Sequence, residues 1–151
     1  MEDLLASDLA LLWVACSSTL GDSDRGSALL TALREREVPT RVLSERDFAP
    51  LALTESPQGI LAVVGIPSVR LEDIDLNSAP AVVLMLDAVQ DPGNFGTLTR
   101  SAEALGAACV VALGGTVDPW NPKAVRSAAG SSLRLPVVQS DWTAASEYLR
   151  D

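Results

Sequence analysis

Apolar and polar positions alternate along the first half of the chain in a way that predicts a small α/β unit. Short apolar runs typical of strands are separated by stretches with helical spacing. The strands are expected at residues 11–16, 38–43 and 59–66, and the helices at 27–36 and 44–51. Ser44, followed three residues later by Asp47, predicts the start of the second helix, because a serine there can accept a hydrogen bond from a first-turn amide.

A second α/β pattern follows an interruption at residues 68–80, which lose periodicity, gain acids and end on a proline. We therefore predict a linker at 68–80 between domains at 1–67 and 81–151. Strands are expected at 81–86, 109–113 and 135–138. The first helix is expected to run from the Asp91–Asn94 turn to about residue 105, and the second to cover 122–129. A last helix is expected to be capped by Ser140 and to extend through Arg150. The near-continuous Val, Leu and Ala of the first two strands are typical of a parallel sheet. We expect the start of an open sheet in which these two strands are incompletely covered.

Composition narrows the classes of protein and of chemistry. The 151 residues are 48% hydrophobic, enough for a sizeable core, and no apolar run approaches the roughly 20 residues of a membrane span. We therefore expect a cytoplasmic protein with no membrane partner. There is no histidine, which excludes Ser-His-Asp and Cys-His catalysis and histidine-ligated metals. Cys16 and Cys109 lie in apolar runs without C-x-x-C spacing, so we expect buried thiols and no metal site.

The net charge of −9, from 20 acids and 11 bases, argues against a simple nucleic-acid-binding protein. The acids are concentrated before residue 77, however. In the second half, the bases placed to contact phosphate are Arg100, Lys123, Arg126 and Arg134.

The segment LDAVQDPGNFGTLTRSAEALG, from Leu86 to Gly106, places a polar turn between a buried strand and a helix. At about 100° per residue, an apolar face of this helix is expected to hold Phe95, Leu98, Ala102 and Leu105. Arg100 then projects from nearly the opposite face. Gly96 fits a close backbone approach, and Gly106 fits the left-handed position that ends a helix. A solvated arginine on an ordinary amphipathic helix would give the same pattern.

The whole segment matches L-D-x-V-x-D-P-x-N-x-G-x-x-x-R-x-A-x-A-x-G, and by this match the chain resembles the SpoU/TrmH-type RNA ribose 2'-O-methyltransferases of the SPOUT superfamily. The resemblance implies an enzyme that methylates a ribose 2'-hydroxyl of ribosomal or transfer RNA with S-adenosylmethionine, normally as a homodimer. It implies Asn94 and Arg100 as the active-site pair. Because a guanidinium stays protonated, we expect Arg100 to hold a phosphate and stabilise the developing alkoxide, with Asn94 fixing it by a side-chain hydrogen bond.

A second segment, DPWNPKAVRSAAGSSLRLPV from Asp118 to Val137, is similar to the family's P-x-x-P-K-x-x-R-x-S-x-G-x-x-x-x-L-P. Lys123 and Arg126 lie one helical turn apart and are expected to clamp an RNA phosphate, while Ser127 allows close backbone approach. The alternative is a short helix that carries two solvated cations.

Residues 4–66, and above all SPQGILAVVGIP from Ser56 to Pro67, resemble the family's N-terminal substrate-binding domain of L30e-like fold, with Pro57 where a histidine is usual. An α/β domain that only orients or dimerises is the alternative. Family members continue through G-x-E-G-x-G and a Ser-Leu-Asn segment, whose chain forms the trefoil knot that binds the methyl donor. Neither motif occurs before Asp151. We therefore expect the first half of a SPOUT domain at 81–151, in an incomplete form that is inactive by itself.

In that form, Gly114 and Gly115 would line one edge of the cofactor pocket. A non-catalytic RNA-binding or assembly module is the alternative function. A Rossmann nucleotide site is excluded, because no G-x-G-x-x-G follows a strand.

Overall fold

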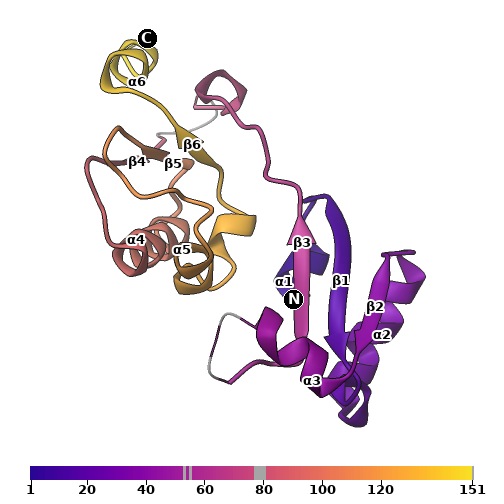
Figure 1. Cartoon of the computed structure of the whole chain (residues 1–151). Helices are drawn as coiled ribbons and strands as arrows, with labels where there is room; N and C mark the ends of the chain where they lie inside the picture. The colour runs from indigo at the N-terminus through magenta and orange to yellow at the C-terminus, as the bar shows by residue number, and fades with distance from the viewer. Residues whose placement is uncertain (53, 55, 77–80, 151) are drawn as a thin grey trace. The chain divides into compact units, whose positions relative to one another are not determined.

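The computed structural model describes residues 1–52, 54, 56–76 and 81–150. The chain forms two compact units, Met1–Ile66 and Pro67–Asp151 (Figure 1). Both are α/β, as the alternation of strands and helices predicted.

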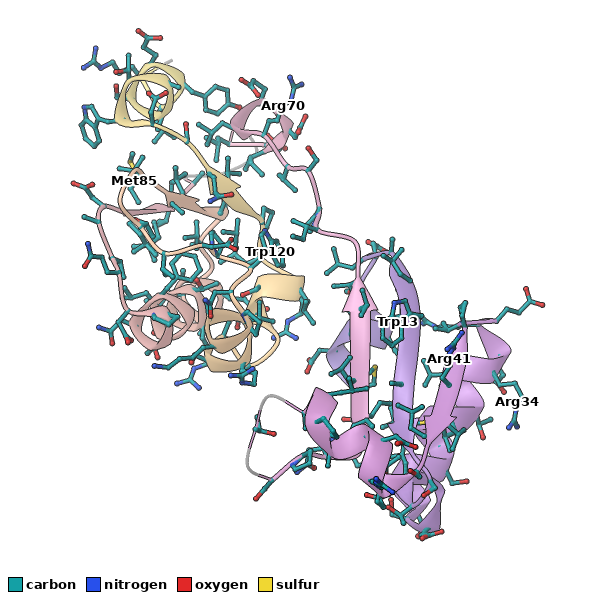
Figure 2. The ribbon with its side chains drawn as sticks, viewed as in Figure 1. Trp13, Arg34, Arg41, Arg70, Met85 and Trp120 are labelled. Carbon is teal, nitrogen blue, oxygen red and sulfur yellow. The ribbon has the colours of Figure 1, made fainter. Side chains whose placement is uncertain are left out.

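The first unit is built on a three-stranded sheet in the order β2-β1-β3, with β1 and β2 parallel and β3 antiparallel to β1. Its elements are α1 (Glu2–Ala6), β1 (Leu11–Ser17), α2 (Asp24–Glu35), β2 (Thr40–Leu43), α3 (Glu45–Phe48) and β3 (Ile60–Val64), with 3-10 turns at Leu20–Asp22 and Ala49–Leu51. Leu5, Val14, Leu29 and Leu33 form the core between α1, β1 and α2. On β1, Trp13 remains 40% exposed (Figure 2). The L30e-like identity of this unit stays a prediction.

The predicted cap of α3 is confirmed. The Ser44 hydroxyl accepts a hydrogen bond from the Asp47 amide at 3.2 Å and donates one to the Asp47 carboxylate at 2.7 Å. The expected helix over 44–51 is nevertheless shorter, because the α-helix ends at Phe48 and continues as a 3-10 turn. Pro50 lies in that turn, and a proline has no amide hydrogen with which to continue an α-helical ladder.

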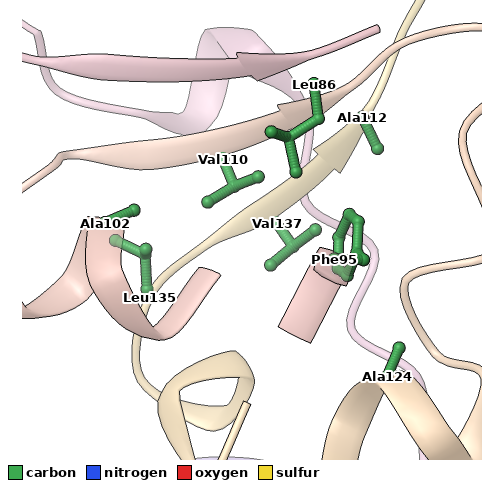
Figure 3. Packing of buried hydrophobic residues seen from close by; sticks show 8 residues of the cluster. All are labelled: Leu86, Phe95, Ala102, Val110, Ala112, Ala124, Leu135 and Val137. Atoms are coloured by element: carbon green, nitrogen blue, oxygen red, sulfur yellow. The ribbon is translucent and has the colours of Figure 1, made fainter. Parts of the chain in front are cut away.

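The second unit has a parallel sheet in the order β4-β5-β6, covered on both faces. Its elements are β4 (Val83–Leu86), α4 (Pro92–Ala104), β5 (Cys109–Ala112), α5 (Pro122–Ser127), β6 (Val137–Gln139) and α6 (Trp142–Tyr148), with 3-10 turns at Leu71–Asp73 and Ser131–Leu133. One hydrophobic cluster joins the sheet to α4 and α5 through Phe95, Ala124 and their neighbours (Figure 3). A second cluster joins the opposite face to α6 and the Leu71–Asp73 turn.

The expectation of incomplete cover is wrong for β5, whose four residues are all buried. Three residues of β4 are only partly buried, because β4 is an edge strand. The segment expected as a linker supplies part of the cover of β5. Leu71 and Ile74 are buried against Cys109 and Val111 of that strand.

The expected linker at 68–80 is thus in part an ordered piece of the second unit. The Tyr148 hydroxyl of α6 donates a hydrogen bond to the Ile74 carbonyl at 3.2 Å. The apolar residues of this segment are too irregularly spaced to show a period, but the tertiary fold buries them. Residues 77–80 lie outside the described part of the chain.

Asp141, and not Ser140 as expected, caps α6, because its carboxylate accepts a hydrogen bond from the Ala144 amide at 2.8 Å. The Ser140 amide is used by the sheet, where it donates to the Ala112 carbonyl at 3.1 Å. Over the described residues, no helix is long and apolar enough to cross a membrane.

Candidate active site

The start of α4 is held by Asp91. Its carboxylate accepts a hydrogen bond from the Asn94 amide at 2.7 Å, and Pro92 occupies the first helical position, where a missing amide hydrogen costs nothing. The second carboxylate oxygen of Asp91 lies 3.6 Å from the Lys123 ammonium of α5. The amide hydrogen bond, together with the charge of Lys123, holds the pKa of Asp91 below its ordinary value. The beginnings of α4 and α5 are therefore tied together by a charged carboxylate.

Gly96 sets the distance between the two helices. A Cβ atom at this position would lie 2.4 Å from the Ala124 carbonyl oxygen, 2.6 Å from Ser127 Cβ and 2.7 Å from the Ala128 amide nitrogen. Two of these three atoms belong to the backbone and cannot rotate away. The close approach that the sequence predicted for Gly96 is present, and α5 is its partner.

The buried face of α4 differs from the predicted one. Phe95 and Ala102 are buried as expected, but Leu98 is 37% exposed and Leu105 is 83% exposed. Gly96 and Thr99 are buried in their place. The Thr99 hydroxyl donates to the Phe95 carbonyl at 2.9 Å, so its polar group is satisfied inside the core.

This rotation of the buried face changes the position of Arg100. Arg100 follows Gly96 by one turn and therefore lies on the flank of α4 beside α5, not opposite the core. The hydrophobic pattern could not show this, because neither glycine nor threonine counts as an apolar position.

Asn94 and Arg100 are both exposed. Within the described part of the chain, neither side chain makes a hydrogen bond or ion pair, so the expected bond between them is absent. The physical reason is their spacing. Six residues correspond to about 9 Å along a helix axis, and helix neighbours are three or four residues apart.

The four cations predicted to contact phosphate divide into two pairs. Lys123 contacts Asp91, and Arg134 forms a fork with the Glu103 carboxylate, with one Nη2–Oε2 distance of 3.1 Å. The hydrogen bonds from Arg134 and from the Ser131 hydroxyl, the latter at 2.6 Å, lower the pKa of Glu103. Arg134 is therefore committed to a contact inside the unit.

Arg100 and Arg126, by contrast, make no ion pair with any residue that the structure describes. Both are exposed, on helices that pack on each other through Gly96. Lys123 is 60% exposed despite its contact with Asp91, and it lies one turn from Arg126 on α5. Of the four predicted phosphate contacts, these three are therefore the ones that can still bind an external anion.

Ser127 lies on the α4 side of α5, with its Cβ against Gly96, and is partly buried. In the family pattern quoted above, the serine stands two residues after the arginine, at the position of Ala128. Ala128 is fully buried and packs its amide against Gly96. Ser127 is therefore a packing residue of the helix pair in this structure.

Gly114 and Gly115 lie in an exposed loop at the carboxyl end of β5. Nothing lies within 4 Å of an ideal Cβ on Gly114, and Gly115 has a φ of +80°, which favours glycine. The loop packs beside the one that follows β4, since the Thr116 hydroxyl donates to the Leu86 carbonyl at 2.9 Å. Open parallel sheets bind ligands at this edge, outside the carboxyl ends of their strands. The described residues contain no cluster of three or more potential metal ligands.

The second unit is therefore a parallel α/β domain with an Asp-Pro-capped helix at the carboxyl edge of its sheet, the edge at which open parallel sheets bind ligands. Residues 81–151 match the model of the SpoU rRNA Methylase family. This segment, which holds α4 and α5, therefore has the sequence of a SpoU rRNA Methylase domain.

Solved structures show the same fold. The structure aligns over 99% of its length with an AdoMet-bound rRNA methyltransferase from Sinorhizobium meliloti, with a TM-score of 0.83, 22% identity and 54% of that chain covered. It also aligns over 99% of its length with the SpoU methyltransferase AviRb from Streptomyces viridochromogenes in complex with AdoMet. This alignment has a TM-score of 0.82 and 24% identity, and it covers 54% of that chain.

Curated relatives are more similar in sequence. The chain is 43% identical over 105 residues to the 23S rRNA (guanosine(2553)-2'-O)-methyltransferase RlmP of Bacillus subtilis, a match that covers 70% of this chain and 40% of the relative. It is 42% identical over 99 residues to the mitochondrial rRNA methyltransferase 3A of Danio rerio, over 62% of this chain and 22% of the relative. The chain thus spans less than half the length of the curated relatives that it matches here.

Proposed function

We propose that the protein takes part in methyl transfer from S-adenosylmethionine to a ribose 2'-hydroxyl of ribosomal or transfer RNA. One observation carries the proposal. The SpoU family match covers the helix pair α4–α5, where Arg100 and Arg126 are exposed without an ion-pair partner among the described residues. The names of the relatives, which are 23S rRNA 2'-O-methyltransferases in Bacillus subtilis and Streptomyces viridochromogenes, support the same reaction. We further propose a homodimer that acts in the cytoplasm.

Arg100 has the role of an electrostatic stabiliser. Its guanidinium remains protonated and cannot accept the proton of the 2'-hydroxyl, so it is not the general base. It donates instead to a phosphate oxygen or to the oxygen on which negative charge develops, where a fixed donor lowers the barrier most. Asn94, one and a half turns nearer the start of the helix, supplies an amide to the RNA independently of Arg100.

Lys123 and Arg126 provide the phosphate clamp. They are exposed, one turn apart, and carried by a helix whose position is fixed by Gly96 and by the Asp91 contact. Contacts to phosphate fix the register of the RNA and carry no sequence information. Ser127 contributes by allowing α5 to approach α4 closely.

Gly114 and Gly115 fit one edge of a cofactor site. The open space at Gly114 and the left-handed backbone of Gly115 leave the main chain of this loop accessible at the carboxyl edge. S-adenosylmethionine, when bound, supplies an electrophilic methyl group on a sulfonium. The two glycines would hold the donor through backbone groups, without a side chain in the way.

The test is a methyl-transfer assay with radiolabelled S-adenosylmethionine and ribosomal RNA, on a form of the protein that contains residues 1–151 and shows turnover before substitution. Methylation of the 2'-oxygen makes the adjacent phosphodiester resistant to alkali, so the label should be recovered in an alkali-resistant dinucleotide. We expect Arg100→Lys to lower turnover by about 100-fold or more, the usual effect of losing a positioned donor. Arg34→Lys, an exposed change on α2, is the matched control and should leave turnover unchanged (Figure 2).

Two outcomes would contradict parts of the proposal. Normal turnover of Arg100→Lys would exclude a role for the guanidinium fork. Calorimetric titration distinguishes the methyltransferase from the alternative function. RNA binding without binding of S-adenosylmethionine would identify a non-catalytic RNA-binding module.

A further inference from the structure

Trp120 is a large aromatic residue that the core of the second unit does not use. It lies in the loop between β5 and α5, is only partly buried, and is absent from both hydrophobic clusters of the unit. Figure 2 labels it there. A tryptophan is rarely buried completely, and part of this indole remains accessible for contact with a ligand.

The backbone of Trp120 is held in place on both sides. Its amide donates to the Asp118 carboxylate at 3.0 Å, and the next amide, of Asn121, donates to the Asp118 carbonyl at 3.0 Å. Pro119 is among the most deeply buried residues of the chain, and Pro122 opens α5. The indole is therefore presented from a fixed turn and not from a loose loop.

The surroundings of this turn are those of the candidate active site. Asn121 caps α5 by accepting a hydrogen bond from the Lys123 amide at 2.9 Å, and the Lys123 ammonium reaches Asp91 at the start of α4. Trp120 thus lies within one helical turn of Lys123 and two turns of Arg126 along the chain. One short segment therefore carries a partly exposed indole and two exposed cations.

We propose that Trp120 stacks on an unpaired base of the RNA substrate while Lys123 and Arg126 hold the neighbouring phosphates. This inference rests on the proposed function and adds the substrate class to it. RNA bases in a duplex are already stacked, and their faces are inaccessible, whereas bases in loops and single strands stack readily on aromatic side chains. The base that Trp120 contacts is therefore in an unpaired region of the RNA.

The other tryptophans make the proposal testable by fluorescence. The sequence contains three tryptophans, and Trp13 and Trp142 are 40% and 64% exposed, so phenylalanine should replace them at little cost. In the Trp13→Phe, Trp142→Phe chain, Trp120 alone reports binding. The probes are a short single-stranded RNA oligonucleotide and the same strand annealed to its complement. We expect the single strand to quench the emission and the duplex to quench it much less.

Substitution of Trp120 in the otherwise unchanged chain measures how much the indole contributes to the affinity for RNA. Trp120→Ala should weaken binding of the single strand about fivefold to a hundredfold, the range for loss of one base–aromatic stack, and Trp120→Phe should restore most of it. Trp142→Ala is the matched control and should bind normally, because this tryptophan follows the acidic Asp141 and α6 carries no lysine or arginine. Circular dichroism spectra of the variants show that the fold is kept.

The outcomes separate the inference from the function on which it rests. Unchanged affinity of Trp120→Ala, with RNA binding and methyl transfer intact, would overturn the stacking role and leave the proposed function standing. Equal quenching by single strand and duplex would overturn the inference that Trp120 contacts an unpaired base. No binding of either RNA by the unchanged chain would overturn the RNA substrate and the stacking role together.

Discussion

Replacement of Gly96 by alanine tests how closely the two helices of the candidate active site approach. On helix propensity alone the change should stabilise α4 by about 1 kcal/mol. In the structure, however, the added methyl group would lie 2.4 Å from the Ala124 carbonyl oxygen, whereas ordinary contacts lie at about 3.5–4.0 Å. The helix α5 must therefore move away by about 1 Å, which separates Ala124 from the cluster around Phe95.

Overpacking of this kind costs about 1–3 kcal/mol, and the upper part of that range applies because the atoms met are backbone atoms. After the gain in helix propensity, we expect a net loss of about 1–2 kcal/mol. At about 4–8 °C per kcal/mol for a unit of this size, the melting temperature of the second unit should fall by about 5–15 °C.

The measurement is thermal unfolding followed by circular dichroism. Gly114→Ala is the matched control, because nothing lies within 4 Å of its Cβ position and its φ is not in the left-handed region. It should melt like the unchanged chain. A Gly96→Ala variant as stable as the control, or more stable, would refute the argument that α4 and α5 are in backbone contact at this point.

Three further predictions concern the same unit. Asn121→Ala should cost about 1 kcal/mol of stability in urea unfolding, because the Lys123 amide loses its acceptor at 2.9 Å, while Asn121→Asp should keep the cap; equal losses in both variants would contradict this. Ser132→Ala should be neutral or slightly stabilising in the same assay, since the buried hydroxyl has no hydrogen-bond partner among the described residues; a loss above about 1 kcal/mol would reveal a partner. Glu103→Gln should lower stability at neutral pH, where the carboxylate binds Arg134. Because the folded-state pKa of Glu103 lies below its ordinary 4.5, this difference should be complete above pH 4.5 and disappear as the pH falls through the lowered value; a difference constant with pH would exclude the ion pair as its cause.

Local patterns in the sequence predicted most of the secondary structure, because strands, helices and their caps depend on residues that are neighbours in the chain. The six strands lie within one or two residues of the apolar runs, and Gly106 has the left-handed φ of +76° expected after α4. The cap at Ser44 follows from a hydrogen bond across three residues. Family membership was predicted in the same way, since a motif of fixed spacing is a property of the chain itself.

Two of the errors share one cause, which is that a partner distant in sequence decided the outcome. The irregular segment before residue 77 is ordered because β5 and α6 bury Leu71 and Ile74. Asp141 caps α6 in place of Ser140, whose amide donates to the Ala112 carbonyl and so continues the pairing with β5.

The sequence by itself determined the α/β class, the six strands, most of the helices and the motif that carries Asn94 and Arg100, whereas the short helix α1 was not predicted. The tertiary structure decided which face of α4 is buried, because the backbone of α5 takes the place that an apolar side chain would fill at Gly96. It also decided which cations remain accessible. Arg134 meets Glu103 across 31 residues of chain, whereas the described residues give Arg100 no ion-pair partner. Long-range contacts of this kind are fixed by packing, and the order of residues along the chain does not reveal them.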